Sequence, residues 1–349
     1  MKIATSTGDF SRFPMTEQQR VQELYDAGFR YVDVNFYTCN KPGSWLLRSD
    51  WKEQTYALKA FGETLGMKFV QSHGPNVNAL EPGENWENDL ESVKRSLEAC
   101  AILGISTCVL HMGWQIGPSK EEWFRRNKAF VEQFFPIMER TGVYLLHENS
   151  TKANMKERYY PVTGEEMAEF CDYVNHPLFG ACWDTGHANC EGHQYEDIIA
   201  MGDHLKAIHF NDNRGEKDEH LMPFNGTMSM DDIMHGLLDI GYKGYFTLEC
   251  ESTLKDGKGW PYKRRVSERD DRLFNVPLEI IRLQEKVLYA TAKYILEQYD
   301  CFESENLCRK GLPFRQFFRF QFISLFKSAQ PGNYHHCHCE EHSEAIPDK

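Results

Sequence analysis

Residues 179–189 read FGACWDTGHAN and contain the pattern that decides the fold. The first five residues are small or apolar, which is expected of a strand that is buried on both faces. Asp184 follows directly, and the small and polar residues after it end the strand. Such a run, closed by a chemically active side chain, is typical of a parallel strand whose carboxyl end faces an active site.

Seven further runs of this kind occur in the first 250 residues. Most are separated by amphipathic stretches, such as Glu91 to Leu103 and Asn127 to Arg140, in which apolar residues return every three or four positions. A helical pattern over Pro277 to Tyr299 closes the last unit. The eight predicted strands are Ile3 to Ser6, Tyr31 to Phe36, Lys68 to His73, Thr107 to His111, Val143 to Glu148, Phe179 to Asp184, Leu205 to Phe210 and Tyr245 to Glu249.

The spacing of these runs predicts an α/β fold, a (βα)8 or TIM barrel with a parallel eight-stranded core. They begin about 26 to 40 residues apart, which is the length of a strand, a helix and two loops. An open doubly wound sheet is the alternative. It is disfavoured because no Gly-rich phosphate turn follows the first strand.

The last 49 residues differ from the rest of the chain. They are rich in Phe and Cys and show no consistent period. We therefore expect residues 1–300 to form the barrel and residues 301–349 to be an atypical tail outside the functional fold. Its cluster His335 to Cys339 could bind a metal, but it lacks the paired spacing of a structural zinc site. An ordinary docking appendage is the remaining alternative.

The composition indicates which binding partners and which cellular compartment to expect. Lys+Arg 39 against Asp+Glu 52 gives a net charge of −13, so the chain has no broad basic footprint for nucleic acid or an anionic membrane, and we expect neither partner. The 11 cysteines are an odd number, and Cys108, Cys182 and Cys250 fall inside predicted strands, which favours reduced thiols. The chain starts without a signal-peptide pattern and holds no run of about 18 apolar residues, so we expect a cytoplasmic protein.

The predicted strand ends carry one type of chemistry. In a barrel of this kind the carboxyl ends of the strands meet at the active site, and six of them end here in side chains that bind metals. They are His73, His111, Glu148, Asp184, His209 and Glu249. Any one of them alone would more often be a hydrogen-bonded or ion-paired structural residue.

Four of these residues form a set that suits a divalent ion. Glu148 shares a strand face with Leu146, and Asp184 shares one with Cys182, so both carboxylates point inward. Carboxylates that end apolar strands are costly unless they are paired or bind a cation. Together with His209 and Glu249 they make an oxygen-rich site that suits Mn²⁺, Mg²⁺ or Co²⁺ and tolerates Zn²⁺.

At this point residues 1–290 resemble the xylose isomerase-like barrels, a family of sugar and sugar-phosphate isomerases and epimerases that also includes the endonuclease IV type of nuclease. The most specific piece is Cys182 to Asn189 (CWDTGHAN). It is followed by His209 to Asn213 (HFNDN) and by Asp218 to Leu221 (DEHL), with Pro223 and Gly226 after them.

The ketose 3-epimerase branch implies a metal-dependent sugar isomerase or epimerase that works through an enediolate. Its single ion, Mn²⁺ in the first place, would be held by Glu148, Asp184, His209 and Glu249. The two Glu residues would also be the catalytic acid and base, since one carboxylate removes the substrate proton and the other returns it. A related inosose dehydratase would share this first step.

Further side chains would bind the small carbohydrate substrate in this interpretation. They are His73, His111, His187, Arg214 and His220. For Arg214 a solvent-exposed ion pair with its acidic neighbours Glu216 or Asp218 is an equal alternative. The epimerase branch often places its Arg one residue later, where this chain has Gly215. Trp45 and Trp114 could wall the pocket, whereas Trp183 alternates away from Asp184 and is expected in the core. A homo-oligomer is compatible with this interpretation.

The nuclease branch is the main rival. It implies a trinuclear zinc phosphodiesterase for abasic DNA, with all nine ligand types present at His73, His111, Glu148, Asp184, His187, His209, Asp218, His220 and Glu249. Asp218 and His220 would then be additional metal ligands. The net charge of −13 and the absence of a basic stretch interleaved with aromatic residues argue against it. The segment Lys217 to Pro223 also resembles the isomerase-type relatives more closely. A barrel that binds metal or sugar without turnover is a third alternative, which would need neither Glu148 nor Glu249 as a proton carrier.

Overall fold

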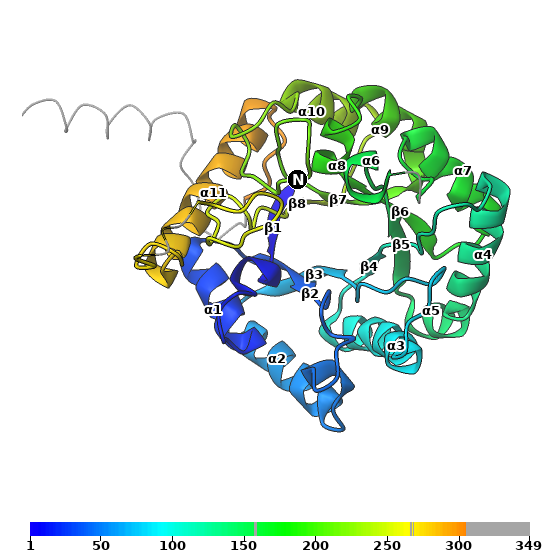
Figure 1. Ribbon diagram of the computed structural model, residues 1–349, viewed down its shortest axis with the longest axis horizontal. Helices are drawn as coiled ribbons and strands as arrows, with labels where there is room; N and C mark the ends of the chain where they lie inside the picture. The colour runs from blue at the N-terminus through cyan, green and yellow to red at the C-terminus, as the bar shows by residue number, and fades with distance from the viewer. Residues whose placement is uncertain (157–158, 266, 268, 305–349) are drawn as a thin grey trace, which may run out of the picture. The chain divides into compact units, whose positions relative to one another are not determined.

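Eight parallel strands surround a central axis, and helices cover them on the outside (Figure 1). The computed structural model describes residues 1–156, 159–265, 267 and 269–304. The strands are β1 (Lys2–Ser6), β2 (Tyr31–Asn35), β3 (Lys68–His73), β4 (Thr107–Leu110), β5 (Tyr144–Glu148), β6 (Phe179–Asp184), β7 (Leu205–His209) and β8 (Tyr245–Leu248). The TIM barrel predicted from the spacing is confirmed.

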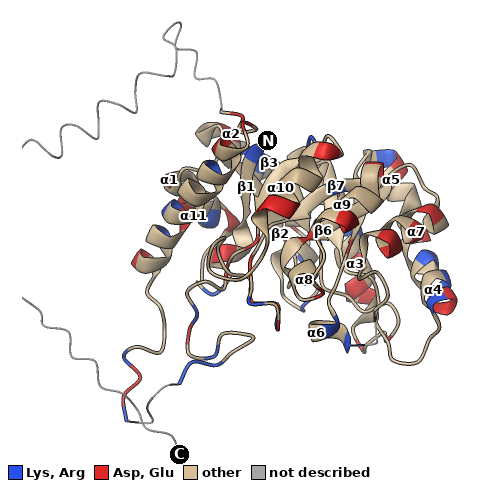
Figure 2. Ribbon diagram, turned by 90° about the horizontal axis from the view of Figure 1, so that it is seen from above, with Lys and Arg blue, Asp and Glu red and all other residues tan. Residues whose placement is uncertain are grey.

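The helices alternate with the strands along the chain. They are α1 (Glu17–Ala27), α2 (Trp51–Leu65), α3 (Trp86–Leu103), α4 (Lys120–Glu132), α5 (Phe135–Thr141), α6 (Lys152–Met155), α7 (Gly164–Val174), α8 (Thr185–Asn189), α9 (Tyr195–Met201), α10 (Met230–Asp239) and α11 (Leu278–Gln298). Basic and acidic residues are interspersed along outer helices such as α4 (Figure 2). Among the described residues, no helix combines the length and the apolarity needed to cross a bilayer.

The sheet closes through a short contact between its two end strands. Neighbouring strands pair in the order β7-β6-β5-β4-β3-β2-β1-β8, so β1 pairs with both β2 and β8. Phe210 follows β7 and forms a parallel bridge to Leu248 of β8. Its backbone N–H donates to the Thr247 carbonyl at 2.7 Å, and its carbonyl accepts from the Glu249 N–H at 3.1 Å. This closure brings the ends of β7 and β8 together.

The inward side chains of the strands fill the barrel. Val109, Leu146, Cys182 and Ala207 form a buried cluster of their own, with Tyr144 packed against it. Because side chains alternate along a strand, Glu148 lies on the same face as Leu146, and Asp184 on the same face as Cys182. The inward direction that the sequence predicts for both carboxylates is therefore confirmed.

One predicted helix is two. The pattern over residues 127–140 predicted a single helix, but α4 ends at Glu132 and α5 begins at Phe135. Pro136 occupies the first turn of α5. Proline has no N–H to donate and its ring collides with the carbonyl four residues earlier, which is Glu132, so a continuous helix cannot form there.

The barrel unit extends slightly beyond the predicted boundary at residue 300. It comprises Met1–Glu303, and Ser304–Lys349 is a separate unit. The Glu303 N–H donates to the Met1 carbonyl at 2.9 Å, and the Glu303 carboxylate lies 3.2 Å from the N-terminal ammonium group. The features predicted for the tail, including His335 to Cys339, lie outside the described residues.

A buried carboxyl pair joins α11 to the barrel. Asp9, just after β1, and Glu285 of α11 are 2% and 0% exposed. The Thr5 hydroxyl donates to Asp9 Oδ2 at 2.7 Å, and the Gln284 amide donates to Glu285 Oε1 at 3.2 Å. Burial and the neighbouring Glu285 carboxyl raise the pKa of Asp9, and burial raises the pKa of Glu285 to about 7. The pair is therefore stable only while it keeps a proton.

This pair predicts a pH-dependent loss of stability. The folded protein keeps a proton on Glu285 up to about pH 7, whereas the unfolded chain releases it near 4.5, the ordinary pKa of a glutamate side chain. The free energy of unfolding should therefore fall as the pH rises between these values. In Glu285→Gln this fall should be smaller by on the order of 2–3 kcal/mol, because the amide does not titrate. Denaturant unfolding at pH 5 and 7.5 measures it, with the exposed Glu53→Gln of α2 as control. The same dependence of the free energy of unfolding on pH in Glu285→Gln and in the control would show that Glu285 does not hold this proton.

Candidate metal centre and active site

A cavity of about 750 Å³ opens at the carboxyl ends of the strands. Seven of the predicted site residues line it: His73, His111, Glu148, His187, Asp218, His220 and Glu249. Asp184 and His209 are 0% and 1% exposed and contact lining residues. Side chains that come from six different strand ends or the loops behind them are thus brought to one place.

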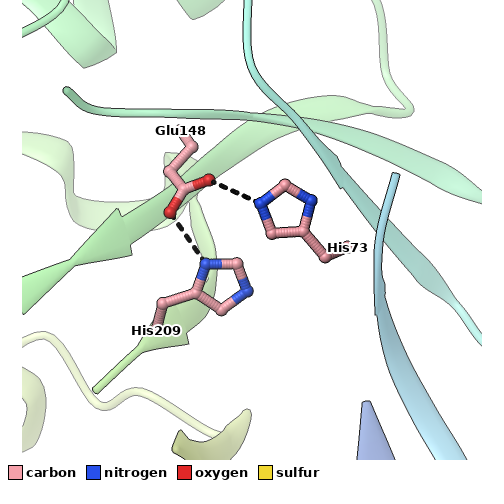
Figure 3. A group of neighbouring side chains, drawn as sticks. All are labelled: His73, Glu148 and His209. Carbon is pink, nitrogen blue, oxygen red and sulfur yellow. Dashed lines mark hydrogen bonds and ion pairs between the residues drawn. The ribbon is translucent and has the colours of Figure 1, made fainter. Parts of the chain in front are cut away.

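Glu148 is the centre of this arrangement. Its Oε1 lies 2.8 Å from His209 Nδ1, and its Oε2 lies 3.6 Å from His73 Nε2 (Figure 3). His111 Nε2 lies 3.5 Å from the same Oε2. Glu148 is 1% exposed, so three imidazoles replace the water that a carboxylate would otherwise bind.

Glu249 reaches the same imidazole from the end of β8. Its Oε2 lies 3.3 Å from His209 Nδ1, the nitrogen that Glu148 also contacts. Glu148, Asp184, His209 and Glu249 each offer one ligand atom, and these atoms lie within 4.8 Å of one another. The four residues predicted as a metal set are therefore close enough to bind one ion.

Asparagine side chains fix the position of Asp184. Asn149 accepts from the Asp184 N–H at 2.6 Å and donates to its carbonyl at 3.0 Å. Asn211 donates to Asp184 Oδ2 at 2.7 Å. A Cβ on Gly186 would lie 1.9 Å from Asn211 Oδ1, so the glycine of the DTGH motif makes room for this contact.

A third group lies beside the first two. Asp218 Oδ2 is 3.1 Å from His187 Nε2 and 3.0 Å from His220 Nε2, and it accepts from the Asn154 amide at 2.9 Å. The other nitrogen of His220 lies 3.2 Å from a carboxylate oxygen of Glu251. His187, Asp218 and His220 could also hold an ion.

Buried atoms without partners support the fit of a cation. Glu148 Oε2, His187 Nδ1 and Asp218 Oδ1 are buried and have no hydrogen-bond partner among the residues that the structure describes. A buried polar atom that stays unpaired costs about 1–3 kcal/mol, more when it is charged. Carboxylate oxygens and imidazole nitrogens of this kind are suitable ligands for Mn²⁺, Co²⁺ or Zn²⁺, so the donor set fits a divalent ion.

The two catalytic candidates differ in protonation. Burial opposes ionisation of Glu148, but His209, His111 and His73 hold its pKa well below the usual range. Burial raises the pKa of Glu249 to about 8, although His209 and His220 act in the opposite direction. Without a bound ion, Glu148 is therefore ionised near neutral pH and Glu249 keeps its proton. A divalent ion that Glu249 binds would displace this proton.

Four further residues that the sequence singled out lie in different places. Trp45 and Trp114 line the cavity as predicted. Trp183 is fully buried outside it, where its indole N–H donates to Gln194 at 3.1 Å, so its predicted core position is confirmed. The structure does not bring Arg214 into the cavity lining. Its side chain is 59% exposed and pairs with the buried carboxylate of Glu219.

The barrel fold, the metal-binding side chains at the strand ends and the DTGH motif together point to one protein family. Residues 21–268 match the model of the xylose isomerase-like TIM barrel. The chain belongs to the xylose isomerase-like TIM barrel family.

Proteins with sequences similar to this chain are named as different enzymes. A probable endonuclease 4 from Citrifermentans bemidjiense is 31% identical over 166 residues, which are 43% of this chain and 57% of the relative. A fructoselysine 3-epimerase from Escherichia coli is 39% identical over 69 residues, 20% of this chain and 25% of the relative. The chain thus spans about half the length of the first of these relatives, and less of the second.

The fold has close structural neighbours. A D-psicose 3-epimerase from Clostridium cellulolyticum, solved with D-tagatose, superposes with a TM-score of 0.64 over 85% of this chain and 99% of its own. At 18% identity this likeness establishes the barrel fold.

Several residues of this xylose isomerase-like site were not predicted. Asn149 and Asn211 position Asp184, and the ring of Tyr37 packs edge-on against those of His73 and His111. Asn149 directly follows Glu148 in the printed sequence, and Asn211 follows His209 by two residues. An amide close behind a predicted metal ligand was the available signal.

The geometry predicts a metal site that depends on Asp184. Asp184→Asn keeps the shape of the side chain but removes its charge, so Mn²⁺ affinity should fall by about tenfold or more. Calorimetric titration of chelator-treated full-length protein measures the affinity, and thermal melting should show that Mn²⁺ stabilises the wild type more than the variant. The exposed Asp203→Asn is the matched control. The same affinity in all three proteins would remove Asp184 from the site.

Proposed function

We propose that this chain is a divalent-metal-dependent isomerase or epimerase of a small carbohydrate. One observation carries the proposal: Glu148 and Glu249 approach the same nitrogen of His209, at 2.8 and 3.3 Å. Two carboxyl groups on either side of one position are what proton removal and return at a carbon next to a carbonyl require.

The residues divide the work in this proposal. One of Glu148 and Glu249 removes the proton from the substrate carbon, and the other supplies one, so that an enediolate is formed and consumed. An ion held by Glu148, Asp184, His209 and Glu249, for which Mn²⁺ is our first choice and Mg²⁺, Co²⁺ or Zn²⁺ the alternatives, supplies a positive charge that polarises a carbonyl and its neighbouring hydroxyl.

The cavity supports a small polar substrate. Its volume of about 750 Å³ is within the usual range for small-molecule sites. Aromatic rings of Tyr37, Trp45, Trp114 and Trp260 line it, and such rings pack on the C–H surfaces of sugars. In this proposal His73, His111, His187 and His220 contact substrate oxygens. The name of the fructoselysine 3-epimerase relative agrees with a carbohydrate substrate.

Exchange of a substrate proton with solvent tests the pair of carboxyl groups. Glu148→Gln and Glu249→Gln keep the side-chain size but cannot carry the proton, so deuterium incorporation from heavy water should fall at least about a hundredfold in each. A panel of ketoses and their phosphates, followed by NMR with Mn²⁺ present, provides the measurement. The exposed Glu132→Gln should exchange like the wild type. Undiminished exchange in both site variants, with folding and metal content preserved, would exclude the two-carboxylate mechanism.

Phosphodiester hydrolysis is the second candidate, favoured by specific observations. The groups His73–Glu148–His209, Glu148–Asp184–His209–Glu249 and His187–Asp218–His220 could each hold an ion. The loop after β8 also contains a basic stretch interleaved with aromatic residues, KDGKGWPYKRR at 255–265, which contradicts the expectation that the chain has none. Its Trp260 is 54% exposed and lines the cavity.

Metal stoichiometry separates the two candidates. Elemental analysis of the full-length protein, purified with Mn²⁺ and Zn²⁺ both available, should give about one ion per chain for the isomerase. Close to three zinc ions per chain, with cleavage of a duplex that contains an abasic site, would replace the isomerase with the nuclease. His220→Ala is the matching variant, since it should lower the zinc content only if the third group holds an ion.

A further inference from the structure

The outer face of α11 carries an exposed apolar stripe. Ile280, Leu283, Val287 and Tyr294 are 42%, 57%, 53% and 54% exposed, and the exposed Ala290 completes the stripe. The opposite face of the helix, with Ile281, Leu288, Ala292 and Ile295, packs against the barrel. The helix is therefore apolar on two sides, and no described residue covers the outer one (Figure 1).

The spacing of the stripe is that of a helix–helix seam. Its residues follow one another at intervals of three, four, three and four positions, which is the a/d pattern of a coiled coil. Over 14 residues this seam is about 21 Å long. A second helix that crosses at about 20° could therefore pack along its whole length.

The same patch has both a projection and a hollow. A depression of about 380 Å³ lies between Phe224 and α11, with Val287, Ala290 and Tyr294 among its lining residues. Phe224 is 60% exposed and has a φ of +71°, a conformation that bulky residues rarely adopt. Large exposed side chains thus lie beside a hollow above the small Ala290. The side chains of one copy could fill the hollow of a second copy, as a two-fold interface requires.

The charges along one edge of the stripe favour an antiparallel copy. Glu279, Lys286 and Lys293 follow one another at seven-residue intervals beside the seam. In an antiparallel pair whose two-fold axis passes near Lys286, Glu279 of each copy faces Lys293 of the other. These two pairs of opposite charge outnumber the one like-charge contact, between Lys286 of one copy and Lys286 of the other. In a parallel pair Glu279 and Lys286 would face Gln284 and Thr291, which carry no charge.

We propose that this chain forms a two-fold symmetric dimer in which the outer faces of two α11 helices pack antiparallel. The occupant of the stripe is a second copy of the chain, because one surface supplies the seam, the hollow and both partners of the flanking charge pairs. This inference does not depend on the proposed catalytic function.

Sedimentation of the full-length protein tests the dimer. Wild type at tens of micromolar should sediment at twice the chain mass of 40.7 kDa. Leu283→Glu combined with Val287→Glu should sediment as a monomer, since four carboxylates would meet in the seam. Ile116→Glu, at another exposed apolar residue, should stay dimeric. Circular dichroism establishes that the variants are folded. A monomeric wild type, or a dimer that survives the double substitution, would overturn the proposal.

Charge reversal tests the orientation. Glu279→Lys should raise the dimer dissociation constant by about threefold or more, and adding Lys293→Glu in the same chain should restore it. A dimer that responds to neither substitution would overturn the antiparallel arrangement.

Cross-linking identifies the occupant of the stripe. A thiol introduced by Lys286→Cys lies close to the two-fold axis, so a short bis-maleimide should join two chains at this position, as identified by peptide mass spectrometry. A cross-link instead to Cys308, Cys337 or Cys339 of the same chain would show that the C-terminal tail covers the stripe, and would overturn the dimer.

Discussion

The burial of the Glu148 carboxylate is the constraint on which the site depends. A carboxylate that is 1% exposed is stable only if fixed partners replace its water, and here the partners are imidazoles. His73, His111 and His209 come from three other strand ends, β3, β4 and β7. No single βα unit could supply them, so the site exists only when the barrel has closed. Closure of the barrel therefore also assembles the site.

The same region holds polar atoms that the protein alone does not satisfy. Glu148 Oε2, His187 Nδ1 and Asp218 Oδ1 are buried and make no hydrogen bond to any described residue, which lowers the stability of the folded protein. The apolar core built by the outward faces of the strands and the inner faces of the helices offsets this cost. A cation that binds only the folded state would add stability according to its concentration. These side chains thus destabilise the ion-free protein and would be stabilised by a bound cation. Such local costs are expected at a functional site in an otherwise stable fold.

The sequence is informative about strands and their ends and less informative about loops. The inward direction of Glu148 and Asp184 follows from alternation, which is a property of every strand. The pairing of Arg214 with Glu219 depends on the path of a loop, for which the sequence has no comparable rule. Asn149 was equally hard to predict, because an amide can donate and accept in almost any direction. The break between α4 and α5 was predictable in principle, since Pro136 stands inside the helical pattern.

Helix α11 shows why burial cannot be derived from periodicity alone. Its sequence carries one apolar stripe through Ile281 and Leu288 and a second through Leu283 and Val287, and both have helical spacing. Only the packed barrel shows that the first is covered and the second exposed. The covered stripe includes Glu285, a costly residue in that position, whereas the exposed one is uniformly apolar. A helix that only covers the barrel would be uniformly apolar on its covered face and polar on its outer face. The barrel alone therefore does not explain the apolar residues on the outer face of α11.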